Sequence, residues 1–98
     1  MSRPKKCRNI KCQPNAYYFK PRAIPMLYLE EIVLSIDEFE AIRLADHKGL
    51  YHDAAAAEME ISRTTFGRIL KQGREKVAEA LVEGKALRIE SLSYKAHK

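Results

Sequence analysis

"EISRTTFGRILKQGREK", residues 60–76, is the stretch on which the fold of this 98-residue chain depends. Ser62 suits the N-cap of a helix, because its hydroxyl can accept a hydrogen bond from an amide of the first turn. A step of 100° per residue from Phe66 gathers an apolar stripe within about 60° of that side chain. The stripe contains Ile69, Leu70, Gly73, Val77, Ala80 and Leu81. The pattern predicts a helix over residues 62–83 that ends at Gly84.

The face opposite this stripe carries polar and basic residues near the start of the helix. Arginine can bond guanine through two hydrogen bonds, threonine can contact a base edge or a thymine methyl, and glycine removes bulk where a backbone meets DNA. Basic residues farther around or along the helix suit phosphates. We therefore expect Arg63, Thr64, Gly67 and Arg68 to face bases, and Lys71 and Arg74 to contact phosphates, with Lys76 continuing the basic series.

Two more helices are predicted before residue 60. Ser35 and Glu38 match the S-x-x-E capping box, in which each side chain bonds the other residue's backbone amide. A helix over residues 36–47 follows, with Ile36, Phe39, Ile42 and Ala45 on one face. A second, short helix covers residues 52–59 and contains four consecutive alanines, which favour a helix and let another helix approach closely.

The predicted helices 52–59 and 62–83 fit a helix-turn-helix. That motif joins a short helix to a second one through a tight turn, and the crossing needs small side chains such as Ala55 and Ala56. Two positions depart from the usual pattern. Glu60 stands where the turn usually has glycine. A residue other than glycine loses about 1 kcal/mol of stability when its backbone is left-handed. Tyr51 or His52 stands at the N-cap of the short helix, where serine or threonine is favoured.

These residues carry a resemblance to known proteins. The stretch "LSIDEFEAIRLADHKGLYHDAAAAEMEISRTTFGRILKQGREKVAEAL", residues 34–81, resembles the helix-turn-helix region four of bacterial primary sigma factors. With "RPKKCR", "YYFKP" and "GKALRIE", almost the whole chain is similar to a family of small prokaryotic predicted DNA-binding proteins of unknown biological role. The resemblance implies DNA binding and transcriptional regulation. It implies no particular target.

The two ends of the chain differ from this helical part. All four prolines lie in the first 25 residues, so we expect residues 1–25 to be an extended, partly β arm. Its basic residues could enter a minor groove; the alternative is a solvated tail that gives only diffuse attraction. These residues are Arg3, Lys5, Lys6 and Arg8. "LYLEEIVLS", residues 27–35, contains either a short strand at residues 31–34 or the end of a helical turn. Residues 85–98 are expected to form a C-terminal extension with a frayed end, because they have no caps and weak periodicity.

Charge is segregated along the chain. The net charge is +7 over residues 1–22, −7 over residues 23–60 and +5 over residues 61–98. Such segregation is typical of proteins that bind a polyanion, and the alternative is a basic tail on a neutral domain. No stretch approaches the ~20 apolar residues that span a bilayer. We find no signal peptide, and with only two cysteines we expect a reducing, cytoplasmic location without membrane contact.

Other chemistry finds little support. Cys7 and Cys12 are expected to be reduced thiols; zinc binding, with His47 and His52 as the only other candidate ligands, and a disulfide are the alternatives. The carboxylates lack a partner base, a nucleophile motif or a glycine-rich loop, so we expect no enzyme, no metal and no cofactor. His47 and His52 are expected to face solvent. The aromatic run of residues 17–19 either stacks on bases or belongs to the core or a dimer interface.

The sequence therefore predicts a mainly α protein: a three-helix, sigma region four-like helix-turn-helix domain over residues 26–84 with a basic N-terminal arm. The leading hypothesis is a sequence-specific double-stranded DNA-binding transcription regulator. We expect a homodimer, because one recognition helix reads only a few base pairs. The alternative is a protein-interaction module that docks on RNA polymerase or another regulator through the acidic segment 23–60 and contacts DNA weakly.

Overall fold

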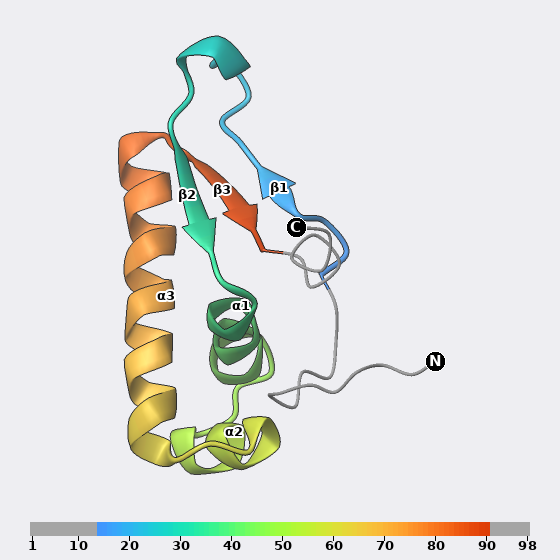
Figure 1. Ribbon diagram of the computed structural model, residues 1–98, viewed down its shortest axis with the longest axis vertical. Helices are drawn as coiled ribbons and strands as arrows, with labels where there is room; N and C mark the ends of the chain where they lie inside the picture. Colours follow the sequence, from blue (N-terminus) through green and yellow to red (C-terminus); the bar gives the residue numbers. More distant parts are fainter. Residues whose placement is uncertain (1–13, 91–98) are drawn as a thin grey trace.

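A computed structural model describes residues 14–90 as a mainly helical protein with a small sheet (Figure 1). The elements in chain order are β1 (Tyr18–Phe19), the 3₁₀ turn η1 (Met26–Tyr28), β2 (Glu31–Leu34), α1 (Ile36–Ile42), the π-helical η2 (Arg43–His47), α2 (His52–Met59), α3 (Arg63–Glu83) and β3 (Ala86–Ile89). Between residues 14 and 90, no helix combines the length and the apolar character that crossing a membrane requires.

The sheet has the strand order β1-β3-β2 (Figure 1). β3 runs antiparallel to β1 and parallel to β2, with Glu31 opposite Ala86 and Leu34 opposite Ile89. A parallel pair needs a long crossover, and here all three helices lie between the two strands. The sequence predicts no strand in the C-terminal extension, whereas residues 86–89 form the central strand of the sheet. Their partners lie far away in the chain, so local periodicity could not reveal the pairing.

A carboxylate joins the three strands. The Tyr18 hydroxyl donates to Glu31 Oε2 at 2.8 Å, and Arg88 Nε donates to Glu31 Oε1 at 3.2 Å. These two bonds lower the pKa of Glu31, the one from Tyr18 most, while donating its hydroxyl hydrogen to Glu31 raises the pKa of Tyr18. The aromatic arm segment is thus part of the sheet, which accounts for Tyr18 without a role in base stacking.

The first predicted helix begins with the expected capping box. Ser35 N donates to Glu38 Oε1 at 2.9 Å, and Glu38 N donates to the Ser35 hydroxyl at 3.1 Å. The helix does not run regularly to residue 47, because η2 widens into π winding, with Lys48 N bonded to Arg43 O at 2.8 Å.

The buried face of α1 and η2 is only partly the one predicted, because Ile42 and Ala45 do pack against the core cluster. Ile36 and Phe39 are only half-buried, whereas Ala41 and Leu44 are fully buried. Two glutamates take buried positions because cations lie against them: Glu40 bonds Arg43, and Glu38 pairs with a lysine of α3. The predicted face counted apolar residues alone and could not include these charged ones.

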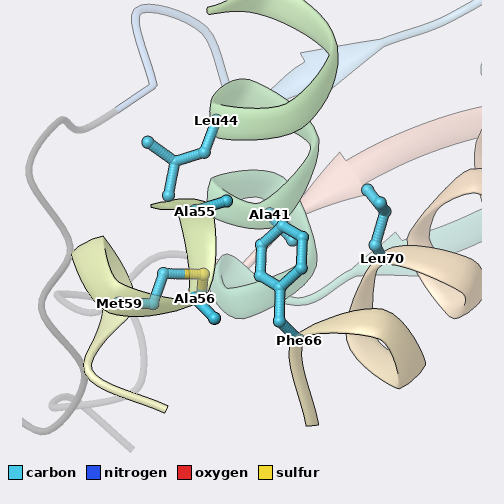
Figure 2. Packing of buried hydrophobic residues seen from close by; sticks show 7 residues of the cluster. All are labelled: Ala41, Leu44, Ala55, Ala56, Met59, Phe66 and Leu70. Atoms are coloured by element: carbon cyan, nitrogen blue, oxygen red, sulfur yellow. The ribbon is translucent and has the colours of Figure 1, made fainter. Parts of the chain in front are cut away.

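One hydrophobic cluster joins α1, η2, α2 and the first half of α3 (Figure 2). Its members are Ala41, Leu44, Ala55, Ala56, Met59, Phe66 and Leu70. The small side chains of Ala55 and Ala56 let α2 lie close to Phe66, as predicted. The predicted stripe is wrong at Leu81, whose side chain is 79% exposed. Beyond Leu70 the neighbours of α3 change to α1 and then the sheet, and Ala80 is the last residue of the helix to be buried.

Gly73 lets α1 and α3 approach closely. A Cβ added to Gly73 would lie 3.1 Å from Glu38 Cβ and 3.1 Å from Ile42 Cδ1. A Cβ there would require these two neighbours to shift by a few tenths of an ångström, so glycine suits this crossing. The crossing fixes the direction of α3, and with it the position of the residues predicted to meet DNA.

Candidate nucleic-acid interface

The connection between α2 and α3 is a tight turn. Glu60 adopts the left-handed conformation, with φ 60° and ψ 44°, that the usual glycine would adopt without strain. Met59 is buried and Ile61 packs against the core cluster, so an apolar residue anchors each side of the turn. The Ser62 hydroxyl then accepts a bond from Thr65 N at 3.1 Å and starts α3. Tyr51, by contrast, gives α2 no side-chain cap.

The four residues predicted to face bases lie in the first two turns of α3. We call Arg63, Thr64, Gly67 and Arg68 the reading face. All but Gly67 are exposed, and Gly67 is half-exposed with nothing within 4 Å of the Cβ it lacks. Thr64, Gly67 and Arg68 share one side of the helix by their spacing of three and four residues. This side is open, so a large partner can approach the helix backbone at Gly67.

The basic residues of this half of α3 differ in their partners. Arg63 Nε lies 2.7 Å from Asp53 Oδ1, and both side chains are well exposed. Lys71 pairs with Glu75 on the same helix surface. Among residues 14–90, Arg68 makes no ion pair. Arg68 is therefore the cation of the reading face that is most available to an external anion.

Arg74 is held more firmly. Its guanidinium donates to both oxygens of Asp46, at 2.7 Å and 3.1 Å. This bond lowers the pKa of Asp46 and raises the pKa of Arg74. About half of the Arg74 side chain remains exposed, so the guanidinium can still face solvent on its other side.

Lys76 does not continue the basic surface. Its ammonium group donates to Val33 O and to Glu38 Oε1, both at 2.8 Å. The Glu38 side chain is 6% exposed and that of Lys76 is 36% exposed, so the carboxylate is shielded from water while part of the lysine still meets solvent. Lys76 therefore joins α3 to the end of β2 and the start of α1, and its ammonium group is engaged within the protein.

In the part of the chain that the structure describes, opposite charges of segments 23–60 and 61–98 pair with one another. Five ion pairs join a cation from residues 61–98 to a carboxylate from residues 23–60. These are Arg63–Asp53, Arg74–Asp46, Lys76–Glu38, Lys85–Glu30 and Arg88–Glu31. Sequence reasoning missed Asp46 and Asp53 as partners of the candidate interface, because the two signs were counted by segment and no local spacing connects them. The net charge of a segment thus overstates the charge it presents to a partner.

A small open depression lies beside the reading face. It has a volume of about 380 Å³ and is lined by His52, Gly67, Leu70, Lys71, Arg74, Glu75 and Ala78. His52 is not simply solvent-facing as predicted, because its ring packs edge-on to Phe66 with centroids 5.3 Å apart. One side of the depression is therefore formed by a histidine that packs against the core.

The remaining predicted site residues lie outside the described part of the chain. These are Arg3, Lys5, Lys6 and Arg8 of the basic arm, together with Cys7 and Cys12. Within residues 14–90, no group of three or more histidine, cysteine or acidic residues is arranged to hold a metal ion.

Comparison with known proteins places the chain in a family. The family described as "Protein of unknown function DUF134" matches residues 1–97. The chain belongs to this family. It is 47% identical over 97 residues to the UPF0251 protein Teth39_0655 of Thermoanaerobacter pseudethanolicus, covering 99% of this chain and 82% of that one.

Two further relatives extend the comparison. A UPF0251 protein of Moorella thermoacetica is 52% identical over 94 residues, which cover 96% of this chain and 63% of the relative. A UPF0251 protein of Halothermothrix orenii is 51% identical over 98 residues, which cover all of this chain and 73% of the relative. No solved structure shows a significant match. The relatives are prokaryotic, and the family is described as one of unknown function.

Proposed function

We propose that this protein is a sequence-specific double-stranded DNA-binding protein that regulates transcription. In this proposal α2 and α3 form a helix-turn-helix similar to region four of primary sigma factors, and the start of α3 enters the major groove. The observation that carries it is Arg68, an exposed arginine without an ion pair in residues 14–90, beside Gly67 and Thr64 on an open helix surface. Arg68 can bond a guanine edge, and Thr64 can contact a neighbouring base.

The flanking cations suit the backbone of the duplex. Lys71 and Arg74 lie three residues apart near the middle of α3 and keep exposed side chains, so they can meet phosphates on either side of a groove. Arg63 is similarly placed in the first turn. Their present partners are surface carboxylates, and surface ion pairs contribute only about 0–1 kcal/mol, so phosphates can replace them.

Docking through the acidic segment is the weaker alternative. Glu38 and Glu40 are buried, and Glu30, Glu31, Asp46 and Asp53 each pair with a cation of the same chain. A segment whose carboxylates are engaged in this way offers a basic partner less charge than its sequence suggests. The alternative remains distinguishable by experiment, since it requires no base preference.

The direct test is selection of bound sequences from a random duplex pool, followed by titration of a selected and a scrambled duplex at several salt concentrations. If five to seven of the basic residues in the arm and the first half of α3 meet phosphates, log Kd against log salt should have a slope of about 4–6 per chain. Enrichment of one sequence with this salt dependence supports the proposal. A pool that stays random after selection, or binding that ignores salt, contradicts it.

A further inference from the structure

Exposed apolar side chains gather at the end of the molecule opposite the reading face. Seven large hydrophobic residues in residues 14–90 are well exposed, and five of them lie in η1 or in the last turn of α3. We call these five, Met26, Leu27, Tyr28, Leu81 and Val82, the apolar end. Leu27 and Val82 are more than four-fifths exposed. A cluster of this kind marks an interaction surface more often than a solvated one.

Specific contacts place η1 and the last turn of α3 at the same end of the molecule. Ala86 N bonds Glu30 O at 2.8 Å, just after η1 and just after α3, and Lys85 Nζ lies 3.4 Å from Glu30 Oε1. Ile24 reaches the residue that ends α3, since its Cδ1 would lie 3.8 Å from a Cβ on Gly84. Figure 1 shows η1 projecting beyond the sheet near the C-terminal end of α3.

The turn holds its apolar residues in place. Tyr28 N bonds Pro25 O at 3.0 Å, and Leu29 N bonds Met26 O at 3.2 Å. The chain therefore presents three consecutive large apolar side chains from a hydrogen-bonded turn. The described ends of the chain lie at the other end of the sheet. There Ile89 N donates to Tyr17 O, and Glu90 N donates to Leu34 O.

We propose that the apolar end is a homodimer interface, in which the apolar ends of two copies of this chain pack on one another about a two-fold axis. This inference names the contact surface of the dimer expected in the proposed function, and it rests on that function for its choice of occupant. A two-fold interface uses the same patch on both copies, which an apolar patch satisfies without charge pairing. Five large exposed side chains supply several hundred Å² per copy, the scale of the ~800 Å² that a partner contributes to a stable interface.

The direction of α3 is what selects a second copy as the occupant. The helix has 21 residues, and at 1.5 Å per residue it is about 30 Å long. It begins at the reading face and ends at the apolar end (Figure 1). Two copies joined at their apolar ends keep both reading faces free. Two such helices that diverge from a shared end can reach successive major grooves about 34 Å apart.

The test is sedimentation equilibrium of the full chain from about 1 to about 100 µM, a range that detects micromolar dissociation constants. Leu27→Lys and Leu81→Lys each place a charge in the proposed interface, and Tyr51→Lys changes an equally exposed residue near the reading face. All three positions are exposed, so each monomer should keep its fold, and the leucine variants should lose only the part of the melting temperature that dimerisation contributes. The wild type and Tyr51→Lys should be dimers, and both leucine variants should dissociate with a Kd raised at least about tenfold.

Other outcomes overturn the inference. A wild type that is monomeric at every concentration shows that the apolar end has another partner or none. Leucine variants that dimerise as well as Tyr51→Lys place the interface elsewhere. Assemblies larger than a dimer exclude the closed two-fold contact. Failure of the proposed function looks different: the wild type would dimerise but bind no duplex. If both hold, monomeric Leu81→Lys should bind a single half-site like the wild type but lose its tighter binding to a paired site.

Discussion

The two halves of α3 use the same kinds of residue for opposite purposes. Lys71 in the first half lies at the surface, whereas Lys76 in the second half joins β2 to α1 through an ion pair with a shielded carboxylate. Gly67 faces open space, whereas Gly73 lies against the backbone and side chains of α1. The comparison teaches that the composition of a basic, glycine-containing helix does not reveal which of its residues face a partner. The packing of its neighbours decides which residues are available to a partner.

The junction between the halves carries the largest expected effect. Phe66 is fully buried and contacts His52 at the centre of the core cluster. Phe66→Ala should lower the free energy of unfolding by about 3–5 kcal/mol, because it leaves a cavity beneath both helices. Denaturant unfolding followed by circular dichroism measures the change, with Phe66→Leu as the milder control. A Phe66→Ala variant as stable as the wild type would mean that another face of α3 packs in the core.

The two lysines should separate stability from binding. Lys76→Met should lower the free energy of unfolding by about 1–3 kcal/mol, because Glu38 keeps its buried charge and loses its cation. Lys71→Met should change stability by less than about 0.5 kcal/mol, because its pair with Glu75 is a surface one. For duplex binding the order reverses: Lys71→Met should weaken all sequences alike and lower the salt slope by about one. Equal effects of the two variants on stability would erase the distinction between the halves.

The two glycines provide the sharpest matched pair. Alanine is the better helix former by about 1 kcal/mol, so Gly67→Ala should stabilise the protein by up to that amount. Gly73→Ala should instead destabilise it by about 1–2 kcal/mol, because the added Cβ lies 3.1 Å from two α1 atoms. Gly67→Ala should also weaken duplex binding where the backbone meets DNA. Thermal melts of both variants, and a titration of Gly67→Ala, test these signs; stabilisation by both would show that α1 and α3 are not closely packed.

Much of the helical part was predictable from sequence because its signals are local. The capping box at Ser35, the alanine helix and the cap at Ser62 each involve residues within one or two turns. β3 was missed because its pairing joins Ala86–Ile89 to strands near the other end of the chain. The partners of Arg63 and Arg74 were missed for a related reason, since the positions of Asp53 and Asp46 depend on how α2 and η2 lie beside α3. Local patterns predict elements, whereas ion pairs between elements follow only from their packing.

The most direct test of the central claim is the ratio of affinities for a selected and a scrambled duplex, measured at physiological salt for the wild type and Arg68→Ala. The reading face predicts a wild-type ratio of at least about 10³. Loss of the Arg68 guanidinium should reduce that ratio by about 10–100-fold, corresponding to 1–3 kcal/mol at one base position, and leave the scrambled duplex nearly unaffected. A wild-type ratio near one, or an Arg68→Ala variant that binds both duplexes more weakly by the same factor, would contradict the claim that α3 reads bases.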